Sequence, residues 1–302
     1  MVYRTSAVQR GINCMAIKKD MKISIPAFVK WAGGKKQLLH QFNSFFPKKI
    51  EKYFDPFVGG GAVTFYILKY HSPKEILISD INEELINAYN IIKNKVEALI
   101  EGLGEYKKKH NKEFYYKIRS QDPSKLSDVE RAIRFIYLNK TCFNGLYRVN
   151  SKGGFNVPIG SYKNPAICPE KDLREISKFL QNVKIKVMPF EKIIQYAKEN
   201  DFIYFDPPYY PIKKSSFTTY TKDNFLEEGQ KKLSKVFNRL SEKGCKVMLS
   251  NSDTPFIKSL YKDHKISFVK ANRMINCNGN GRGKISEIVV TNYSPIHSQT
   301  KL

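Results

Sequence analysis

The sequence is poor in cysteine pairs and metal-ligand clusters. Its five cysteines are an odd number, and no two of them form a Cys-x-x-Cys pair. This argues against a disulfide framework or a zinc site and favours a reducing compartment, the cytoplasm. The five histidines show no metal-ligand spacing either. We therefore expect no bound metal ion.

Long apolar runs are also missing. No stretch approaches the roughly 18 uncharged apolar residues of a membrane-spanning helix. Residues 1–21 have no apolar run long enough for a secretory signal peptide. They mix Arg, Gln, Lys and small residues, and Met15 and Met21 are later possible starts. We predict a loose N-terminal extension and no membrane partner.

Acidic residues are scarce in comparison with basic ones. Lys and Arg total 52 against 28 Asp and Glu, which gives a net charge of +24. Such an excess favours a polyanionic partner, most often nucleic acid. A lysine-rich surface without any such partner is the alternative, so the charge alone decides little. The 302 residues fit one large domain or a core domain with an insertion.

The pattern between residues 53 and 99 predicts a βαβ unit. A strand at 53–58 runs into three glycines, Gly59 to Gly61, and then into a helix at 62–70. A second strand at 76–78 ends at Asp80. Asn82 then caps an amphipathic helix whose apolar residues recur as far as Leu99. Strand, glycine turn, helix, strand and acidic residue follow the order of a nucleotide-binding half.

The late segments again alternate strand and helix, as a parallel sheet requires. Strands are predicted at 202–205, 246–249 and 287–291, with a charged helix at 226–240. The intervening stretch is helical, basic and rich in aromatic residues, and a Gly-rich turn at 150–154 indicates a β-hairpin. We predict an α/β catalytic domain from residues 22–99 and 190–302, split by a mostly helical insertion at 100–189.

The glycine turn and Asp80 indicate a cofactor that contains a nucleoside. Glycines let the backbone approach a ligand closely, and an acidic residue about 20 positions on accepts hydrogen bonds from ribose hydroxyls. The glycines lack the G-x-G-x-x-G form of a diphosphate binder. Gly34-Lys35 is followed by Lys36, so a P-loop is also excluded. A purely structural turn remains the alternative.

The tetrapeptide Asp206-Pro207-Pro208-Tyr209 indicates transfer of a methyl group to an exocyclic amine. It follows an apolar strand, where α/β folds place their ligands. The Asp206 carboxylate and the Pro207 carbonyl form two acceptors for the two amine protons, and this directs the nitrogen lone pair at a sulfonium methyl group. Tyr209 is placed to stack on the base, which must be flipped out of a duplex.

The chain resembles the Dam family of N6-adenine DNA methyltransferases, the alpha group that includes GATC-specific modification enzymes. The resemblance runs from about residue 28 to 293. Its markers are residues 30–35, 55–61, 79–82, 143–148, 155–158, 206–209 and 282–287. It implies a Rossmann-like fold that binds S-adenosyl-L-methionine, with the insertion acting as a target recognition domain. The glycine- and asparagine-rich segment 276–281 departs from the family pattern.

The resemblance also assigns the site residues. Those implied to bind the cofactor are Trp31, Lys35, Asp55, Phe57, Gly59, Gly61, Asp80 and Asp206, with Lys35 near the cofactor's carboxylate end. The implied catalytic residues are Asp206, Pro207 and Tyr209. Those implied to recognise DNA are Lys30, Asn144, Leu146, Arg148, Pro158 and Tyr162. Arg148 matches an arginine that reads guanine, for which a planar fork is well suited.

The expected partner is double-stranded DNA containing GATC, and the enzyme is expected to be a monomer and the modification half of a restriction-modification system. A 5-methylcytosine enzyme needs a cysteine nucleophile, typically after proline, and the sequence has no Pro-Cys pair. N4-cytosine enzymes more often have Ser in place of Asp206, yet this reading stays open. RNA or protein-glutamine methyltransferases more often have Asn there. A DNA-binding module without catalysis would not need all of these residues.

Overall fold

The computed structural model describes residues 23–151, 153–212, 225–272 and 284–295. The predicted extension at 1–21 and the segment 276–281 lie outside these residues. Among the described residues, no helix is long and apolar enough to cross a membrane.

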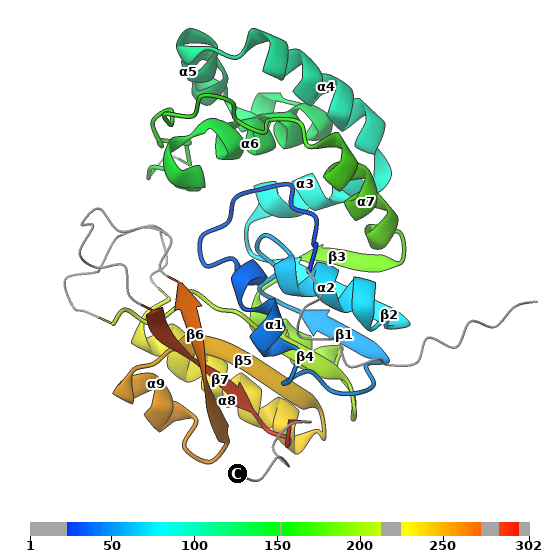
Figure 1. Ribbon diagram of the computed structural model, residues 1–302, viewed down its shortest axis with the longest axis vertical. Helices are drawn as coiled ribbons and strands as arrows, with labels where there is room; N and C mark the ends of the chain where they lie inside the picture. The colour runs from blue at the N-terminus through cyan, green and yellow to red at the C-terminus, as the bar shows by residue number, and fades with distance from the viewer. Residues whose placement is uncertain (1–22, 152, 213–224, 273–283, 296–302) are drawn as a thin grey trace, which may run out of the picture.

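The core of the molecule is a seven-stranded sheet with the order β3-β2-β1-β4-β5-β7-β6 (Figure 1). Its strands are β1 (Lys52–Asp55), β2 (Glu75–Asp80), β3 (Val183–Val187), β4 (Phe202–Phe205), β5 (Lys246–Ser252), β6 (Lys265–Asn272) and β7 (Lys284–Thr291). Strands β1 to β5 are parallel, and β7 runs antiparallel between β5 and β6. The order reverses at β1, and such a switch point is where open α/β sheets bind ligands. The predicted α/β class is confirmed.

Helices cover both faces of this sheet because successive strand residues point to opposite faces. In β4, Phe202 and Tyr204 join the larger apolar core, while Ile203 and Phe205 join the second. The larger core includes side chains of α2 (Ala62–Tyr70) and α3 (Glu83–Asn94). The second includes those of α8 (Glu227–Glu242) and α9 (Pro255–Leu260). The short α1 (Leu39–Phe42) packs on the larger core.

The start of α3 is confirmed, but its end differs from the prediction. The Asn82 side chain accepts a hydrogen bond from Leu85 N at 3.1 Å, as an N-cap does. The helix ends before Lys95, whose φ of −142° is not helical. A new helix, α4 (Val96–Lys109), begins directly after it. The apolar spacing continues across this break because Leu99 and Leu103 of α4 pack into the same core as the apolar residues of α3.

The predicted insertion contains most of α4 and the helices α5 (Lys112–Ser120), α6 (Asp128–Thr141) and α7 (Glu170–Leu180). Figure 1 shows α4, α5 and α6 gathered at one end of the molecule, with β6 and α9 at the other. Helix α6 begins with a capping box in which Ser127 and Glu130 satisfy each other's backbone N–H groups. Its residues from Ala132 onward are buried.

The predicted boundary at residue 190 needs correction. Strand β3 lies within the predicted insertion, yet it pairs in parallel with β2 from Val183 to Val187. It is an edge strand whose lysines alternate with apolar residues, so only part of it is buried. Such alternation is typical of a half-buried strand, but the run is only five residues long and follows the basic helical stretch directly. The insertion that we propose therefore ends before Val183.

The predicted hairpin is present as an irregular loop. Two isolated antiparallel bridges join Cys142 to Ile159 and Val149 to Phe155. Asn150 N donates to Gly154 O at 2.8 Å and closes the turn. Regular strands do not form because Asn144 and Gly145 adopt positive φ values of 55° and 64°, which kink the first arm into a 3-10 turn. We call the described residues 142–151 and 153–160 the recognition loop, after the role that the sequence predicts for them.

Two glycines of α4 give opposite expectations for substitution by alanine. A Cβ at Gly102 would collide with the Ile133 side chain of α6, whereas a Cβ at Gly104 would meet nothing within 4 Å. Overpacking a core costs about 1–3 kcal/mol, and an exposed helical Gly→Ala change stabilises by up to about 1 kcal/mol. We expect Gly102→Ala to lower and Gly104→Ala to raise the free energy of urea unfolding. Equal effects would contradict the α4–α6 packing described.

Candidate active site

The chemistry-bearing side chains meet at one edge of the sheet. Asp55 is the last residue of β1, Asp80 is the last residue of β2, and Asp206 follows β4 directly. These strands are parallel neighbours, so their carboxyl ends lie side by side. Ser250 of β5 adds a hydroxyl group to the same edge. The structure thus brings together the acidic residues that the sequence singled out.

Asp206 is held through one of its two carboxylate oxygens. Lys35 Nζ lies 2.8 Å from Oδ1, and Ser250 Oγ donates to the same oxygen at 2.9 Å. Within the described part of the chain no hydrogen bond to Oδ2 is found. Burial raises the pKa of Asp206, and the Lys35 ammonium opposes that rise. The carboxylate is therefore oriented while one oxygen stays available as an acceptor.

Lys35 lies deeper in the structure than its predicted role implies. Its side chain is only 5% exposed. Besides the ion pair with Asp206, its Nζ contacts Gly33 O and lies 4.5 Å from the centroid of the Tyr209 ring. The predicted contact with the carboxylate end of the cofactor stays a prediction. What the structure shows is a lysine that connects Asp206 and Tyr209.

Two residues of this cluster had no predicted role. Tyr209 donates its hydroxyl hydrogen to Glu287 Oε2 of β7 at 2.8 Å. Burial raises the pKa of Glu287, and Lys35 opposes that rise. Ser250 also contacts the hydroxyl of Tyr204 at 2.8 Å. In the sequence, Glu287 is a single carboxylate at the start of the otherwise apolar predicted strand 287–291, and Ser250 directly follows the predicted strand 246–249.

The glycine turn packs tightly against its surroundings. Gly59 N donates to Asp80 Oδ2 at 3.2 Å, and Tyr89 donates to Gly59 O at 2.9 Å. A Cβ on Gly59 would lie 2.7 Å from the Trp31 ring, and one on Gly61 would lie 2.5 Å from the Tyr89 hydroxyl. Gly61 also has a φ of +74°, which other residues rarely adopt. Both glycines are therefore required by the backbone, and Trp31 lies directly against the turn.

The surface beside Asp80 suits a nucleoside. Asp80 accepts a hydrogen bond from Asn82 N at 3.0 Å and pairs in the sheet with Val187. Val187 and the neighbouring Ile81 are unusually exposed apolar residues, at 51% and 69%. Phe57, two residues after the end of β1, stacks on Phe190 with ring centroids 5.2 Å apart. A carboxylate for ribose hydroxyls next to apolar surface for a base fits the expected cofactor.

Asp55 faces the protein interior and is only 2% exposed. Its carboxyl group accepts hydrogen bonds from Thr64 Oγ1 at 2.7 Å, Tyr53 Oη at 3.1 Å and Phe57 N at 3.3 Å. Burial raises its pKa to about 7, against the opposing hydrogen bonds. Asp55 therefore does not face a ligand. Its predicted cofactor role fits this geometry only if it acts indirectly, by holding the backbone of Phe57 in place.

The residues predicted to recognise DNA lie on and around the recognition loop. Arg148 donates from Nε to Asn156 Oδ1 at 2.6 Å and from Nη2 to Asn156 O at 3.3 Å. Lys30 Nζ lies 3.4 Å from the centroid of the Tyr162 ring. Of the three other predicted residues, Asn144 and Pro158 are exposed and Leu146 is half-buried. The structure therefore places these six residues in one region.

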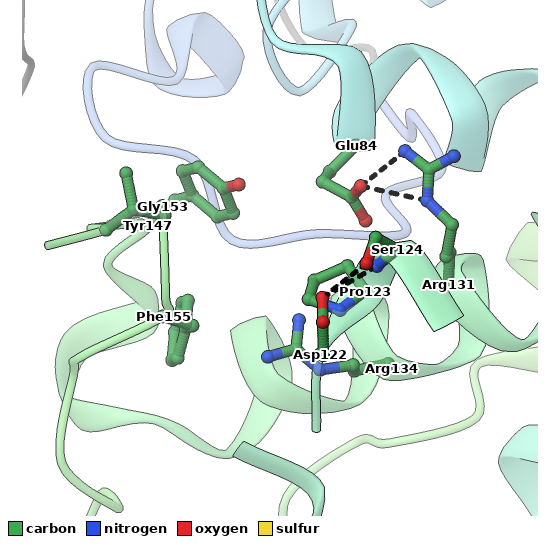
Figure 2. A pocket seen from close by; sticks show the side chains of 10 residues that line it. Glu84, Asp122, Pro123, Ser124, Arg131, Arg134, Tyr147, Gly153 and Phe155 are labelled. Atoms are coloured by element: carbon green, nitrogen blue, oxygen red, sulfur yellow. Dashed lines mark hydrogen bonds and ion pairs between the residues drawn. The ribbon is translucent and has the colours of Figure 1, made fainter. Parts of the chain in front are cut away.

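A pocket lies beside the recognition loop. It encloses about 400 Å³ and is lined by Tyr147 and Phe155 of the loop and by residues of the insertion and of α3. Figure 2 shows Arg131 of α6 directing two guanidinium nitrogens at one oxygen of Glu84. The Tyr147 ring stacks on Trp31 at 6.3 Å. None of the lining residues belongs to the cluster around Asp206.

Comparison with known proteins shows that this chain is similar to DNA adenine methyltransferases. The family described as D12 class N6 adenine-specific DNA methyltransferase matches residues 31–275. The type II methyltransferase M.MjaIII of Methanocaldococcus jannaschii is 46% identical over 90% of this chain and 100% of its own length. The type II methyltransferase M1.LlaDCHI of Lactococcus lactis subsp. cremoris is 45% identical over 92% and 99%.

The DNA adenine methylase of Escherichia coli K12 is 35% identical over 89% of this chain and 95% of its own length. A solved putative methyltransferase from Streptococcus mutans in complex with SAH covers 84% of this chain and 96% of that one, with a TM-score of 0.35 and 10% identity. The chain belongs to the D12 class of N6 adenine-specific DNA methyltransferases. Its methyl donor is S-adenosyl-L-methionine.

The buried Asp55 makes stability depend on pH. Its carboxyl group ionises near 3.8 in an unfolded chain and near 7 in the fold. The stability that it contributes is therefore complete below about pH 3.8 and is lost as the pH rises to about 7. We expect the free energy of unfolding to fall between pH 5 and pH 8 by on the order of 2 kcal/mol more in the wild type than in Asp55→Asn. Parallel pH profiles in urea unfolding would contradict the raised pKa.

Proposed function

We propose that this enzyme methylates the N6 amine of adenine in double-stranded DNA within the sequence GATC, after flipping the adenine out of the helix. The observation that carries the proposal is the Asp206 carboxylate, which Lys35 and Ser250 hold by Oδ1 only. The target sequence follows from the resemblance of the recognition loop to that of GATC-specific enzymes.

The cofactor surface is formed by the glycine turn and the end of β2. S-adenosyl-L-methionine supplies an electrophilic methyl group on a sulfonium. Asp80 is placed to accept hydrogen bonds from the ribose hydroxyls, and exposed Ile81 and Val187 offer apolar surface to the adenine ring. Gly59 and Gly61 keep the backbone free of side chains, and Trp31 closes the turn from the other side.

The target amine is oriented by two acceptors. An exocyclic amine is a poor nucleophile because its lone pair is delocalised into the ring. Asp206 Oδ2 and the Pro207 carbonyl each take one amine proton as a hydrogen bond, which directs the lone pair toward the methyl group. Lys35 keeps the carboxylate oriented and opposes the rise in its pKa. Positioning and electrostatics of this kind supply most of the rate in such transfers.

The Tyr209 ring is fixed at both its edge and one face. Glu287 Oε2 accepts a hydrogen bond from the Tyr209 hydroxyl oxygen at 2.8 Å, and Lys35 Nζ lies 4.5 Å from the ring centroid. The opposite face then serves as the platform for the flipped adenine. Base stacking on an aromatic ring is worth about 1–3 kcal/mol, which offsets much of the cost of unstacking the base.

Arg148 is the residue that we assign to guanine. Asn156 holds its Nε and one further nitrogen, so the guanidinium is oriented before DNA arrives. A planar fork matches guanine O6 and N7. Lys30 and Tyr162 lie together near the loop, and Asn144, Leu146 and Pro158 complete the proposed contact surface.

The biological role that we propose is the modification half of a restriction-modification system. Two relatives at 46% and 45% identity are named type II methyltransferases. Such an enzyme protects sites from a cognate endonuclease without contacting it. Among the described residues, Cys142, Cys168 and Cys245 are free thiols, which fits the reducing cytoplasm, where genomic DNA lies. We propose a monomer as the working form, since one recognition loop and one catalytic centre lie on the same chain.

Expression in a host without DNA methylation tests the function. Genomic DNA from the wild type is expected to resist a nuclease that cuts only unmethylated GATC. Asp206→Asn removes one negative acceptor at unchanged size, and we expect kcat to fall by at least about 10²-fold. Asp201→Asn is the matched control, because Asp201 directly precedes β4, at the strand end opposite to Asp206. We expect this variant to keep its activity. Near-normal turnover by Asp206→Asn would refute the acceptor role.

Arg148→Ala tests the reading of guanine. We expect discrimination between GATC and duplexes with another first base pair to fall by about 1–3 kcal/mol, measured as a ratio of kcat/KM values. Arg174→Ala removes the same charge from the surface of α7, where Arg174 pairs with Glu97 and Glu170, and should leave the ratio unchanged. Equal discrimination by Arg148→Ala and the wild type would exclude this role.

A further inference from the structure

Asn139 lies in the last turn of α6 and is completely buried. Its side chain forms three hydrogen bonds, two to the distant Lys30 and one to Gly145, six residues further along the chain. Asn139 Oδ1 accepts from Lys30 N at 2.7 Å, and Asn139 Nδ2 donates to Lys30 O at 2.8 Å and to Gly145 O at 3.0 Å. One amide thus joins the segment that carries Lys30 to the recognition loop, although Lys30 and Asn139 are 109 residues apart.

The same junction is closed by steric contact. Gly145 has a φ of +64°, and a Cβ at this position would collide with the Lys30 side chain. The Lys30 ammonium is held at its other end, where Nζ donates to Lys140 O at 3.3 Å. The turn at residues 143–145 and the backbone of Lys30 therefore have little freedom to move relative to each other.

The junction stands between the two halves of the proposed reaction. On one side, Asn144 and Arg148 belong to the loop that we propose reads DNA. On the other side, Trp31 follows Lys30 directly and packs against the glycine turn of the cofactor site. Lys35 of the same segment forms the ion pair with Asp206. Asn139 thus bonds the recognition loop to the segment that orients the Asp206 carboxylate.

We propose that Asn139 is a positioning residue that couples sequence recognition to methyl transfer by setting the distance between the recognition loop and the 30–35 segment. This inference rests on the proposed DNA-reading role of the loop. An amide suits the position because it offers one acceptor and two donors to one N–H group and two carbonyl groups. Displacements of about 1 Å at such a junction change reaction rates by about 10²-fold.

Asn139→Asp tests the proposal at nearly constant volume. The aspartate still accepts from Lys30 N, but its carboxylate cannot donate to the two carbonyl groups. The chain offers a matched control in Asn292, which follows β7. Its side chain accepts from Val247 N at 2.8 Å and donates to Cys245 O at 2.8 Å and to Ser241 Oγ at 3.0 Å. This equivalent network lies at the edge of the sheet opposite to Asp206.

The wild-type recognition sequence is mapped first, and both variants are then measured on that sequence and on duplexes that differ by one base pair. We expect Asn139→Asp to lower kcat on the recognition sequence at least about tenfold and to reduce discrimination by a similar factor. KM for DNA should stay within about threefold, because phosphate contacts supply most of the affinity. Asn292→Asp is expected to lower the melting temperature with discrimination unchanged.

The proposal would be overturned if folded Asn139→Asp discriminated between the recognition sequence and altered duplexes as well as the wild type does. It would also be overturned if Asn292→Asp lost as much discrimination as Asn139→Asp. If Asn139→Asp does not fold, Gly145→Ala strains the same junction from the loop side and is expected to show the same loss of discrimination. Discrimination at the wild-type level in that variant overturns the proposal too. A wild type that recognises a sequence other than GATC refutes the proposed target alone, since the variants are compared on whichever sequence was mapped.

Discussion

The ion pair between Lys35 and Asp206 is the interaction on which the site depends. Placing an ammonium group with 5% side-chain exposure costs several kcal/mol unless an opposite charge lies beside it. Asp206 provides that charge, and in return Lys35 fixes Oδ1 and leaves Oδ2 for a substrate. The pair also requires the 30–35 segment to close onto the sheet edge, and the recognition loop closes with it through Asn139.

The cofactor side of the site is built largely from the backbone. Gly59 and Gly61 leave no room for a Cβ because Trp31 and Tyr89 already occupy the space. Asp80 accepts from Gly59 N, so one carboxylate both stabilises the turn and remains at the strand end where ribose is expected. Asp55 beneath it adds a buried group with a raised pKa. Tight packing of polar groups here fixes the geometry before any ligand binds.

Local pattern was sufficient for elements that bury a regular face. β4 and α2 lie at the predicted residues, and Asn82 caps α3 as expected. The edge strand β3 escaped prediction because its five residues carry two lysines and directly follow the basic helical insertion. β6 was not predicted either, and the break at Lys95 left the helical spacing intact on both sides.

The sequence by itself determined which groups carry the chemistry. The glycine turn, Asp80 and the tetrapeptide starting at Asp206 were readable because each follows an apolar strand directly, and parallel strands end at one edge. Only the tertiary structure decided the partners. Tyr209 meets Glu287 across 78 residues, and Asn139 meets Lys30 across 109. Such contacts depend on how the whole chain packs around the sheet, and no local periodicity contains that information.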